Sequence, residues 1–301
     1  MTFPYQHTLA HKISCEGIGL HTGKKVKMTL HPAEEDVGIV FRRNDVKGEA
    51  GYIQASYLNV SSTNLGTTLT NSAGYSVATV EHLMAAFWGC SVDNAMVELD
   101  GPEIPIMDGS SEPFVFLLEC ASVVKQAKHR RVIEVLKKIE VTDDNKRVAI
   151  MPSDSFSVSL EIDFHDKIIS SQSCVFNSAD VSFKSDLCRA RSFCFEHEVD
   201  MMRKAGLAQG GSLDNAIVVG KEGVLNEGGL RYRDEFVRHK VLDCIGDFYL
   251  TNAFVLGRFH GFRSGHALNN KLLRSFFADK DAWRVVKAPE ELAFPPSFIN
   301  A

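Results

Sequence analysis

The sequence has no apolar run long enough to cross a membrane. Its longest runs, such as Leu83 to Trp88, fall far short of the roughly 20 residues that a spanning helix needs. Met1 to Lys12 lacks the apolar core of a secretory signal. The seven cysteines are odd in number, scattered and without C-x-x-C spacing, which favours reduced thiols over disulfides or a thiolate zinc site. We therefore expect a cytoplasmic protein with no transmembrane segment.

An excess of charge of one sign is missing as well. The chain has 33 basic and 38 acidic residues, a net charge of -5, and no long basic stripe. Such a charge balance argues against a nucleic-acid partner. With 301 residues and 45% hydrophobic content, the chain can form one large domain or two ordinary ones.

Periodicity predicts strands followed by helices, twice. In the first half, alternation at Val26, Met28 and Leu30 predicts a strand, and the apolar spacing across Thr79 to Trp88 predicts a buried helix with Thr79 as its N-cap. In the second half we expect strands at 132–135 and 156–164, and helices at 235–250 and 266–277.

A polar, basic stretch at 125–131 separates these two halves and is the best candidate for a link between them. We therefore predict an N-terminal domain over 1–127 and a C-terminal domain over 128–301, both of the α+β class.

The helix predicted at 235–250 carries His239, Asp243 and Asp247 at successive four-residue steps. Residues four apart project from the same helix face, and imidazole with carboxylate is a ligand mix that suits catalytic zinc. The alternative for an isolated H-x-x-x-D pattern is a solvated polar face. Gly246 in the same helix costs roughly 1 kcal/mol relative to alanine, which suggests close packing or the approach of a ligand near it, unless a small residue is merely tolerated.

Glu81-His82 stands at the start of the other predicted helix, among apolar residues. Alone, His82 would more often be a satisfied core histidine. Together with His239 and Asp243 it would complete three protein ligands, leaving a fourth position for water, as in catalytic zinc sites. Glu81 could then remove a proton from that water. The chain has no H-E-x-x-H motif, so it belongs to none of the zincin groups.

His266 follows Ser264-Gly265 at the expected start of the last helix. It could be a simple helix-start residue. If it faces the metal instead, it can protonate a leaving amine, and Asp247 is suited to hold its ring in the cationic form.

Five motifs, in order and spacing, make the chain resemble the UDP-3-O-acyl-N-acetylglucosamine deacetylases of lipid A synthesis along nearly its whole length. They are Gly17-Ile-Gly-Leu-His-Thr-Gly23, Thr79-Val-Glu-His-Leu83, Pro102-Glu-Ile-Pro-Ile-Met-Asp-Gly-Ser110, His239-Lys-x-x-Asp243 and Ser264-Gly-His-x-Leu-Asn-Asn270.

This resemblance implies two similar domains, each a β-sheet packed on helices, with the helical layers face to face, small inserts, and the metal between them. It implies Zn2+ held by His82, His239 and Asp243, with Fe2+ as an alternative because these ligands accept both ions. It also implies hydrolysis of the N-acetyl group of a UDP-linked, 3-O-acylated sugar.

For the reaction, the resemblance implies Glu81 as general base, His266 oriented by Asp247 as acid or electrostatic partner, and Lys240 as a substrate contact. Ser192 stands where the family has an oxyanion-stabilising threonine. Serine keeps the hydroxyl but loses the methyl group that stiffens χ1.

The family resemblance also implies which residues contact the substrate. Aromatic faces and cations suit the uridine diphosphate, and an insert over about 193–224 would hold the acyl chain; the residues implied are Phe164, Phe193, Phe195, Lys146, Arg263, Gly211 and Ser212. The aromatic residues could equally belong to the core, and the cations could be solvated. The glycines at 206–211 lack both nucleotide-phosphate motifs, so a nucleotide loop is excluded.

Two alternatives remain at this stage. The chain could be a zinc deacetylase of another N-acylated sugar, or a nucleotide-sugar binding protein without catalysis. The family resemblance favours a monomer.

Overall fold

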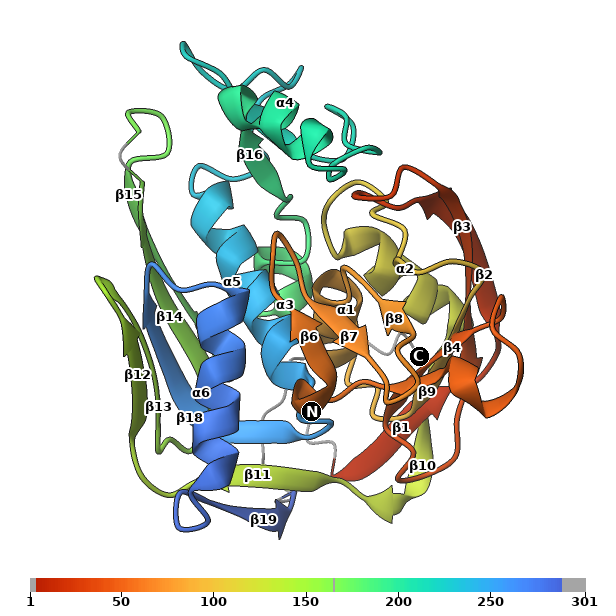
Figure 1. Ribbon diagram of the computed structural model, residues 1–301. Helices are drawn as coiled ribbons and strands as arrows, with labels where there is room; N and C mark the ends of the chain where they lie inside the picture. Colours follow the sequence, from red (N-terminus) through yellow and green to blue (C-terminus); the bar gives the residue numbers. More distant parts are fainter. Residues whose placement is uncertain (1–3, 165, 289–301) are drawn as a thin grey trace.

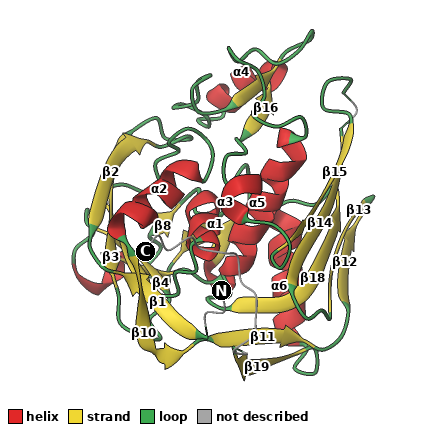
Figure 2. Ribbon diagram, turned by 180° about the vertical axis from the view of Figure 1, so that it is seen from behind, coloured by secondary structure: helices red, strands yellow, loops and turns green. Residues whose placement is uncertain are grey.

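The computed structural model of the protein describes residues 4–164 and 166–288. Its elements form four layers, with a sheet on each outer side and two layers of helices face to face between them (Figures 1 and 2). The predicted α+β class and sandwich arrangement are therefore confirmed.

The first sheet belongs to the N-terminal half. Its strand order is β2 (Ile13–Ile18), β3 (Lys25–Pro32), β9 (Ala95–Leu99), β4 (Ile39–Arg43) and β5 (Tyr52–Gln54). In β3 the side chains of Val26, Met28 and Leu30 are buried, while most of their neighbours face outward. The predicted alternation is thus confirmed, and its apolar face packs toward α1 (Glu81–Gly89) and α2 (Glu112–Ala121).

The second sheet belongs to the C-terminal half. Its main path is β12 (Ile139–Asp143), β13 (Lys146–Met151), β18 (Phe254–Phe262), β11 (Arg131–Val135) and β19 (Trp283–Lys287), and β14 (Phe156–Asp163) joins β18 to β15 (Ser171–Asn177). The helices α5 (Glu235–Tyr249) and α6 (His266–Ala278) cover its inner face. The strands and helices predicted for this half are confirmed to within about two residues.

The remaining elements are short. They are β1 (Tyr5–Leu9), which pairs with β10 (Val123–His129); the hairpin strands β6 (Val60–Ser62), β7 (Thr68–Thr70) and β8 (Ser76–Val77); α3 (Phe183–Asp186); β16 (Phe193–Phe195), which pairs with β17 (Ile217–Val219); α4 (Glu196–Lys204); and the 3-10 turns Gly48–Gly51 and Tyr57–Asn59. The segment carrying β16 and α4 projects beyond the layers at the top of Figure 1.

The two halves share one core. Every residue of α1 is buried, because the helix lies between the first sheet and α5. Its Trp88 packs against Phe156 at 5.0 Å between ring centroids, and against three further rings of the C-terminal half, Phe176, Phe183 and Phe254. These ring contacts hold the C-terminal end of α1 against the C-terminal half, and the helix also packs along α5.

Gly246 lies where α5 crosses α1. A Cβ atom built on Gly246 would stand 2.0 Å from the backbone oxygen of Glu81, a distance that real side chains do not reach. The close packing predicted for this glycine is therefore present, and it sets the separation of the two helices.

The predicted N-cap is wrong. Thr79 has a left-handed backbone with φ 58°, Val80 occupies the cap position, and the Thr79 hydroxyl donates instead to Glu103 Oε1 at 3.2 Å. A threonine before a helix satisfies the pattern for capping, but a buried carboxylate from a distant loop competes for its hydroxyl.

The stretch predicted as a polar link is mostly strand β10. Arg130, at its end, is only 1% exposed and donates to Asp93 Oδ2 at 2.6 Å and to the Ser91 carbonyl at 2.9 Å. The predicted boundary at 127/128 falls within β10, which ends at His129, and β11 begins at Arg131. We keep that boundary as a proposal.

Candidate metal centre and active site

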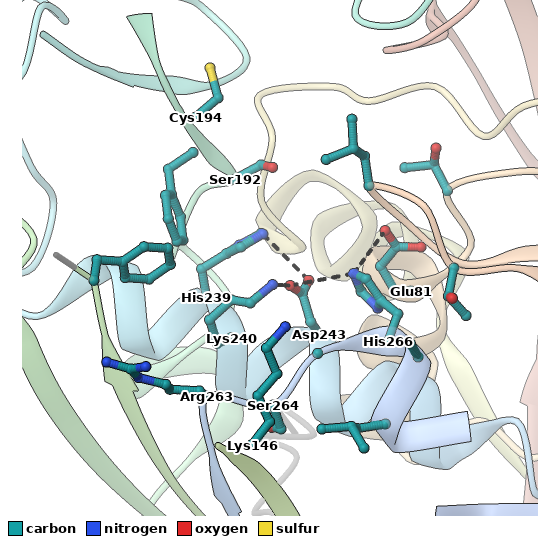
Figure 3. A pocket seen from close by; sticks show the side chains of 18 of the residues that line it. Glu81, Lys146, Ser192, Cys194, His239, Lys240, Asp243, Arg263, Ser264 and His266 are labelled. Atoms are coloured by element: carbon teal, nitrogen blue, oxygen red, sulfur yellow. Dashed lines mark hydrogen bonds and ion pairs between the residues drawn. The ribbon is translucent and has the colours of Figure 1, made fainter. Parts of the chain in front are cut away.

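Three potential metal ligands converge from two helices. His82 is the second residue of α1, and His239 and Asp243 lie one turn apart on α5. The His82 and His239 Nε2 atoms are 3.5 and 3.4 Å from Asp243 Oδ1, and the ligand atoms all lie within 4.8 Å of one another. Figure 3 shows His239 and Asp243 from one side of this site.

The surroundings of these atoms suit a divalent cation. Within the described part of the chain, Asp243 Oδ1 is buried without a hydrogen-bond partner. The His239 ring is oriented by the Ala190 carbonyl, 3.0 Å from its Nδ1. This is the supporting contact that metal-binding histidines usually make.

The protonation states of His239 and Asp243 also suit metal binding. Burial lowers the pKa of His239 to about 3, so its ring is neutral. Burial by itself would raise the pKa of Asp243, but His239 and Lys240 hold it well below its usual value. Neutral imidazole and ionised carboxylate are the forms that bind a metal. The three residues can therefore hold a metal ion.

Glu81 lies beside this centre and is 3% exposed. Its Oε2 accepts a hydrogen bond from the Thr67 backbone N–H at 2.9 Å, and its Oε1 lies 3.9 Å from His266 Nε2. Burial raises the pKa of the Glu81 carboxyl group. A carboxylate with a raised pKa is a better proton acceptor at neutral pH.

His266 is the first residue of α6, and its Nδ1 lies 2.8 Å from Asp247 Oδ2. Burial alone would lower its pKa, but Asp247, through its charge and hydrogen bond, outweighs this effect, and with Glu81 and Asp243 it raises the pKa of His266 to about 9. The ring is therefore protonated at neutral pH.

Two further residues hold Asp247. The Thr67 hydroxyl donates to its Oδ1 at 2.6 Å, and the Asn269 amide donates to its Oδ2 at 2.8 Å. Neither residue received a role from the sequence. Asn269 lay within a quoted motif, but nothing in the sequence connects Thr67 with a carboxylate 180 residues away.

The centre opens into a cavity of about 390 Å³. Besides the residues just described, its lining includes most of the side chains that sequence reasoning selected: Lys240, Ser192, Phe164, Phe193, Phe195, Lys146 and Arg263. Phe164 packs edge-on against Phe193 and Phe195, with ring centroids 5.8 and 5.9 Å apart. Arg263, in a left-handed conformation with φ 51°, pairs with Asp163.

Ser192 is held in place by its backbone. Its N–H donates to the Gly109 carbonyl, and its carbonyl accepts from Ile217 N–H, both at 2.8 Å. The preceding residue, Arg191, forms a buried ion pair with Glu235 at the start of α5, at 2.9 Å. The position of Ser192 at the cavity is thus set by contacts from three separate segments.

A second cavity of about 610 Å³ adjoins the first and shares Leu20, Leu65, Ser192 and Phe193 with it. Gly211 and Ser212, predicted in the acyl-chain insert, line this second cavity. The insert docks on the turn at 19–23 through a hydrogen bond from Gly210 N–H to the Leu20 carbonyl at 3.0 Å.

Glu103 anchors that turn. Its buried carboxylate accepts from the backbone N–H groups of His21 and Thr22, at 2.8 and 2.9 Å. The motifs at 17–23 and 102–110 therefore meet in space, a contact that their positions in the sequence do not reveal.

Comparison with known proteins gives one consistent result. The sequence model of the family described as UDP-3-O-acyl N-acetylglycosamine deacetylase matches residues 6–278. The UDP-3-O-acyl-N-acetylglucosamine deacetylase of Neisseria meningitidis serogroup A / serotype 4A (strain DSM 15465 / Z2491) is 46% identical over 296 residues, which cover 97% of this chain and 96% of that protein.

The structure adds that, among the described residues, no helix is both long and apolar enough to cross a membrane. The family match spans both halves of the chain and includes every residue of the centre built above. The chain belongs to the UDP-3-O-acyl N-acetylglycosamine deacetylase family.

Proposed function

We propose that this protein removes the N-acetyl group from a UDP-linked, 3-O-acylated glucosamine and releases acetate, as a step of lipid A synthesis. The observation that carries the proposal is the convergence of His82, His239 and Asp243 beside Glu81 and His266 in one cavity. We propose zinc as the metal; iron(II) would accept the same ligands.

His82, His239 and Asp243 would hold the ion. When bound, it supplies a Lewis acid that polarises the amide carbonyl and lowers the pKa of water. Glu81 takes a proton from the attacking water, whose oxygen bonds to the carbonyl carbon. His266, protonated at neutral pH, gives its proton to the sugar nitrogen as the carbon–nitrogen bond breaks.

Two more side chains would act on the charge that develops. The Ser192 hydroxyl lines the cavity and can donate to the oxyanion of the tetrahedral intermediate. Lys240 Nζ donates to Asp243 Oδ2 at 2.9 Å and also lines the cavity, so it can reach both the ligand carboxylate and the substrate.

The two cavities suit the two ends of such a substrate. Lys146 and Arg263 can contact the diphosphate, and Phe164, Phe193 and Phe195 offer aromatic surface for the uridine end. The second cavity, lined by Gly211, Ser212 and apolar side chains including Val199, Met202 and Leu213, suits an acyl chain.

This second cavity favours an acylated substrate over another N-acetyl sugar. A binding protein without catalysis would have no use for a buried proton acceptor and a protonated histidine on either side of one site. We keep the cytoplasm as the location and the monomer as the oligomeric state among our proposals.

Acetate release tests the proposal. We expect the purified protein to contain about one equivalent of metal and to release acetate from the UDP-linked 3-O-acyl sugar. A chelator should remove this activity, and zinc should restore it. Equal rates on the substrate without its acyl chain would favour the other-sugar alternative. No release by the metal-loaded protein would favour the binding protein.

The pH dependence should report His266. As pH rises through about 9, His266 loses its proton, so kcat/KM should fall there. Asp247→Asn removes the charge that holds the proton, and burial then lowers the pKa, so the alkaline limb should move down by roughly one pH unit or more. An unchanged alkaline limb in this variant would remove His266 from the role of acid.

A further inference from the structure

Thr67 stands between the two proton-transfer groups of the site. It precedes β7 and is 1% exposed. Its backbone N–H, its carbonyl and its hydroxyl all form hydrogen bonds, to residues of the site or to the residue before α1. Its N–H donates to Glu81 Oε2 at 2.9 Å, its carbonyl accepts from Val80 N–H at 3.2 Å, and its hydroxyl donates to Asp247 Oδ1 at 2.6 Å.

The hydroxyl also meets His266. Thr67 Oγ1 lies 3.2 Å from His266 Nδ1, the same atom that lies 2.8 Å from Asp247 Oδ2. Because the hydroxyl proton is directed to Asp247, its oxygen is free to accept from the ring N–H. Thr67, Asp247 and His266 thus form a closed triangle of hydrogen bonds.

The loop before Thr67 is shaped for close approach to Glu81. Leu65 has φ 58° and Gly66 has φ 153°, and a Cβ atom on Gly66 would stand 2.9 Å from Glu81 Oε1. A glycine at this point lets the backbone pass close to the carboxylate, which brings the Thr67 N–H within hydrogen-bond distance of it.

We propose that Thr67 is a positioning residue for the reaction. Its backbone fixes the carboxylate of Glu81, and its side chain fixes the Asp247–His266 pair, so one rigid residue sets the placement of the proton acceptor relative to the proton donor. The proposal rests on the proposed function, because that function assigns these groups to the two proton transfers.

A side-chain substitution at Thr67 can remove the hydroxyl while it leaves the backbone hydrogen bond to Glu81 in place. Without the hydroxyl, Asp247 Oδ1 is buried with one donor fewer, and Asp247 and the His266 ring can turn together about their remaining contacts. Misplacement of a catalytic group by about 1 Å can lower the rate about 100-fold. Substrate affinity should change little, because Thr67 does not line the cavity.

The test compares Thr67→Val with Thr67→Ser. Valine has the shape of threonine and keeps the backbone N–H to Glu81, but it has no hydroxyl; serine keeps the hydroxyl. We expect Thr67→Val to lower kcat by about 10- to 100-fold with KM within about threefold of wild type, and Thr67→Ser to stay within about threefold in both. Thr68→Val, the same change at the first residue of β7, which lines neither cavity, serves as the matched control.

A double-mutant cycle separates positioning from general destabilisation. In an Asp247→Asn background, Thr67→Val should lower kcat by less than about threefold, because the asparagine has already weakened the Asp247–His266 pair that the Thr67 hydroxyl positions. Thermal unfolding and metal content, measured for every variant, confirm that the compared proteins are folded and loaded. Thr67→Ala provides a second hydroxyl-free variant if the valine variant does not fold.

Proton NMR adds a readout that needs no turnover. The ring Nδ1–H of His266, assigned with His266→Gln, should shift in Thr67→Val and stay in place in Thr67→Ser. The proposal is overturned by wild-type kcat in Thr67→Val, by equal losses in the valine and serine variants, by a full effect in the Asp247→Asn background, or by an unmoved resonance. Absence of acetate release by the wild-type enzyme contradicts the proposed function instead, and the NMR comparison then decides the role of Thr67.

Discussion

Replacing Glu81 by glutamine should lower kcat on the order of 1,000-fold, because the reaction would lose the group that we propose takes the proton from water. Glutamine is isosteric with glutamate, and its amide oxygen can still accept from the Thr67 N–H. The variant should therefore keep its fold, its metal content and a KM within about threefold of wild type.

The measurement is steady-state acetate release together with metal analysis. Glu140→Gln, which removes an exposed carboxylate on β12, is the matched control and should match wild type in every parameter. If Glu81→Gln retains full metal content and kcat within about threefold of wild type, another group accepts the proton. A loss of metal in Glu81→Gln would mean that the substitution disturbs the neighbouring ligand His82.

Gly246→Ala should destabilise the protein by on the order of 3 kcal/mol, although alanine is the better helix former. The added methyl group would meet the backbone oxygen of Glu81 at 2.0 Å and its carbonyl carbon at 2.8 Å. No side-chain rotation relieves an overlap with backbone, so α5 must move away from α1. That movement separates His239 and Asp243 from His82.

Two readouts should therefore change together in Gly246→Ala: the free energy of unfolding falls, and the affinity for the metal falls with it. Gly101→Ala is a suitable control, since its Cβ would meet only the Val26 side chain, at an ordinary contact distance of 3.4 Å. Wild-type stability and metal affinity in Gly246→Ala would show that the helices can separate without cost.

Much of the candidate metal site could be predicted from the sequence because part of it is local. His239 and Asp243 are four residues apart on a helix that the apolar period reveals, and a regular helix places such a pair side by side. Ser192 was implied by the family resemblance rather than by periodicity. Its placement at the cavity depends on Arg191 and Glu235, a contact between residues 44 apart that no local pattern reveals.

The limits of local patterns also explain the incorrect N-cap and the unexpected strand at the predicted link. Thr79 and Arg130 have sequence neighbours that suit a cap and a solvated linker. Their actual partners, Glu103 and Asp93, come from other segments, and burial beside those partners outweighs the local preference. The direction of a polar side chain is decided by whichever partner lies nearest in space.

The sequence by itself determined the class of fold, the extents of the main strands and helices, and the candidate ligand pair on α5, because each depends on backbone geometry and hydrophobic periodicity within a few residues. Only the tertiary structure decided how closely His82 approaches that pair, and how Thr67 and Asn269 orient Asp247. Those distances depend on two sheets closing over facing helices, with Gly246 setting the approach of α5 to α1. Packing between segments far apart in the chain leaves no periodic trace in the sequence.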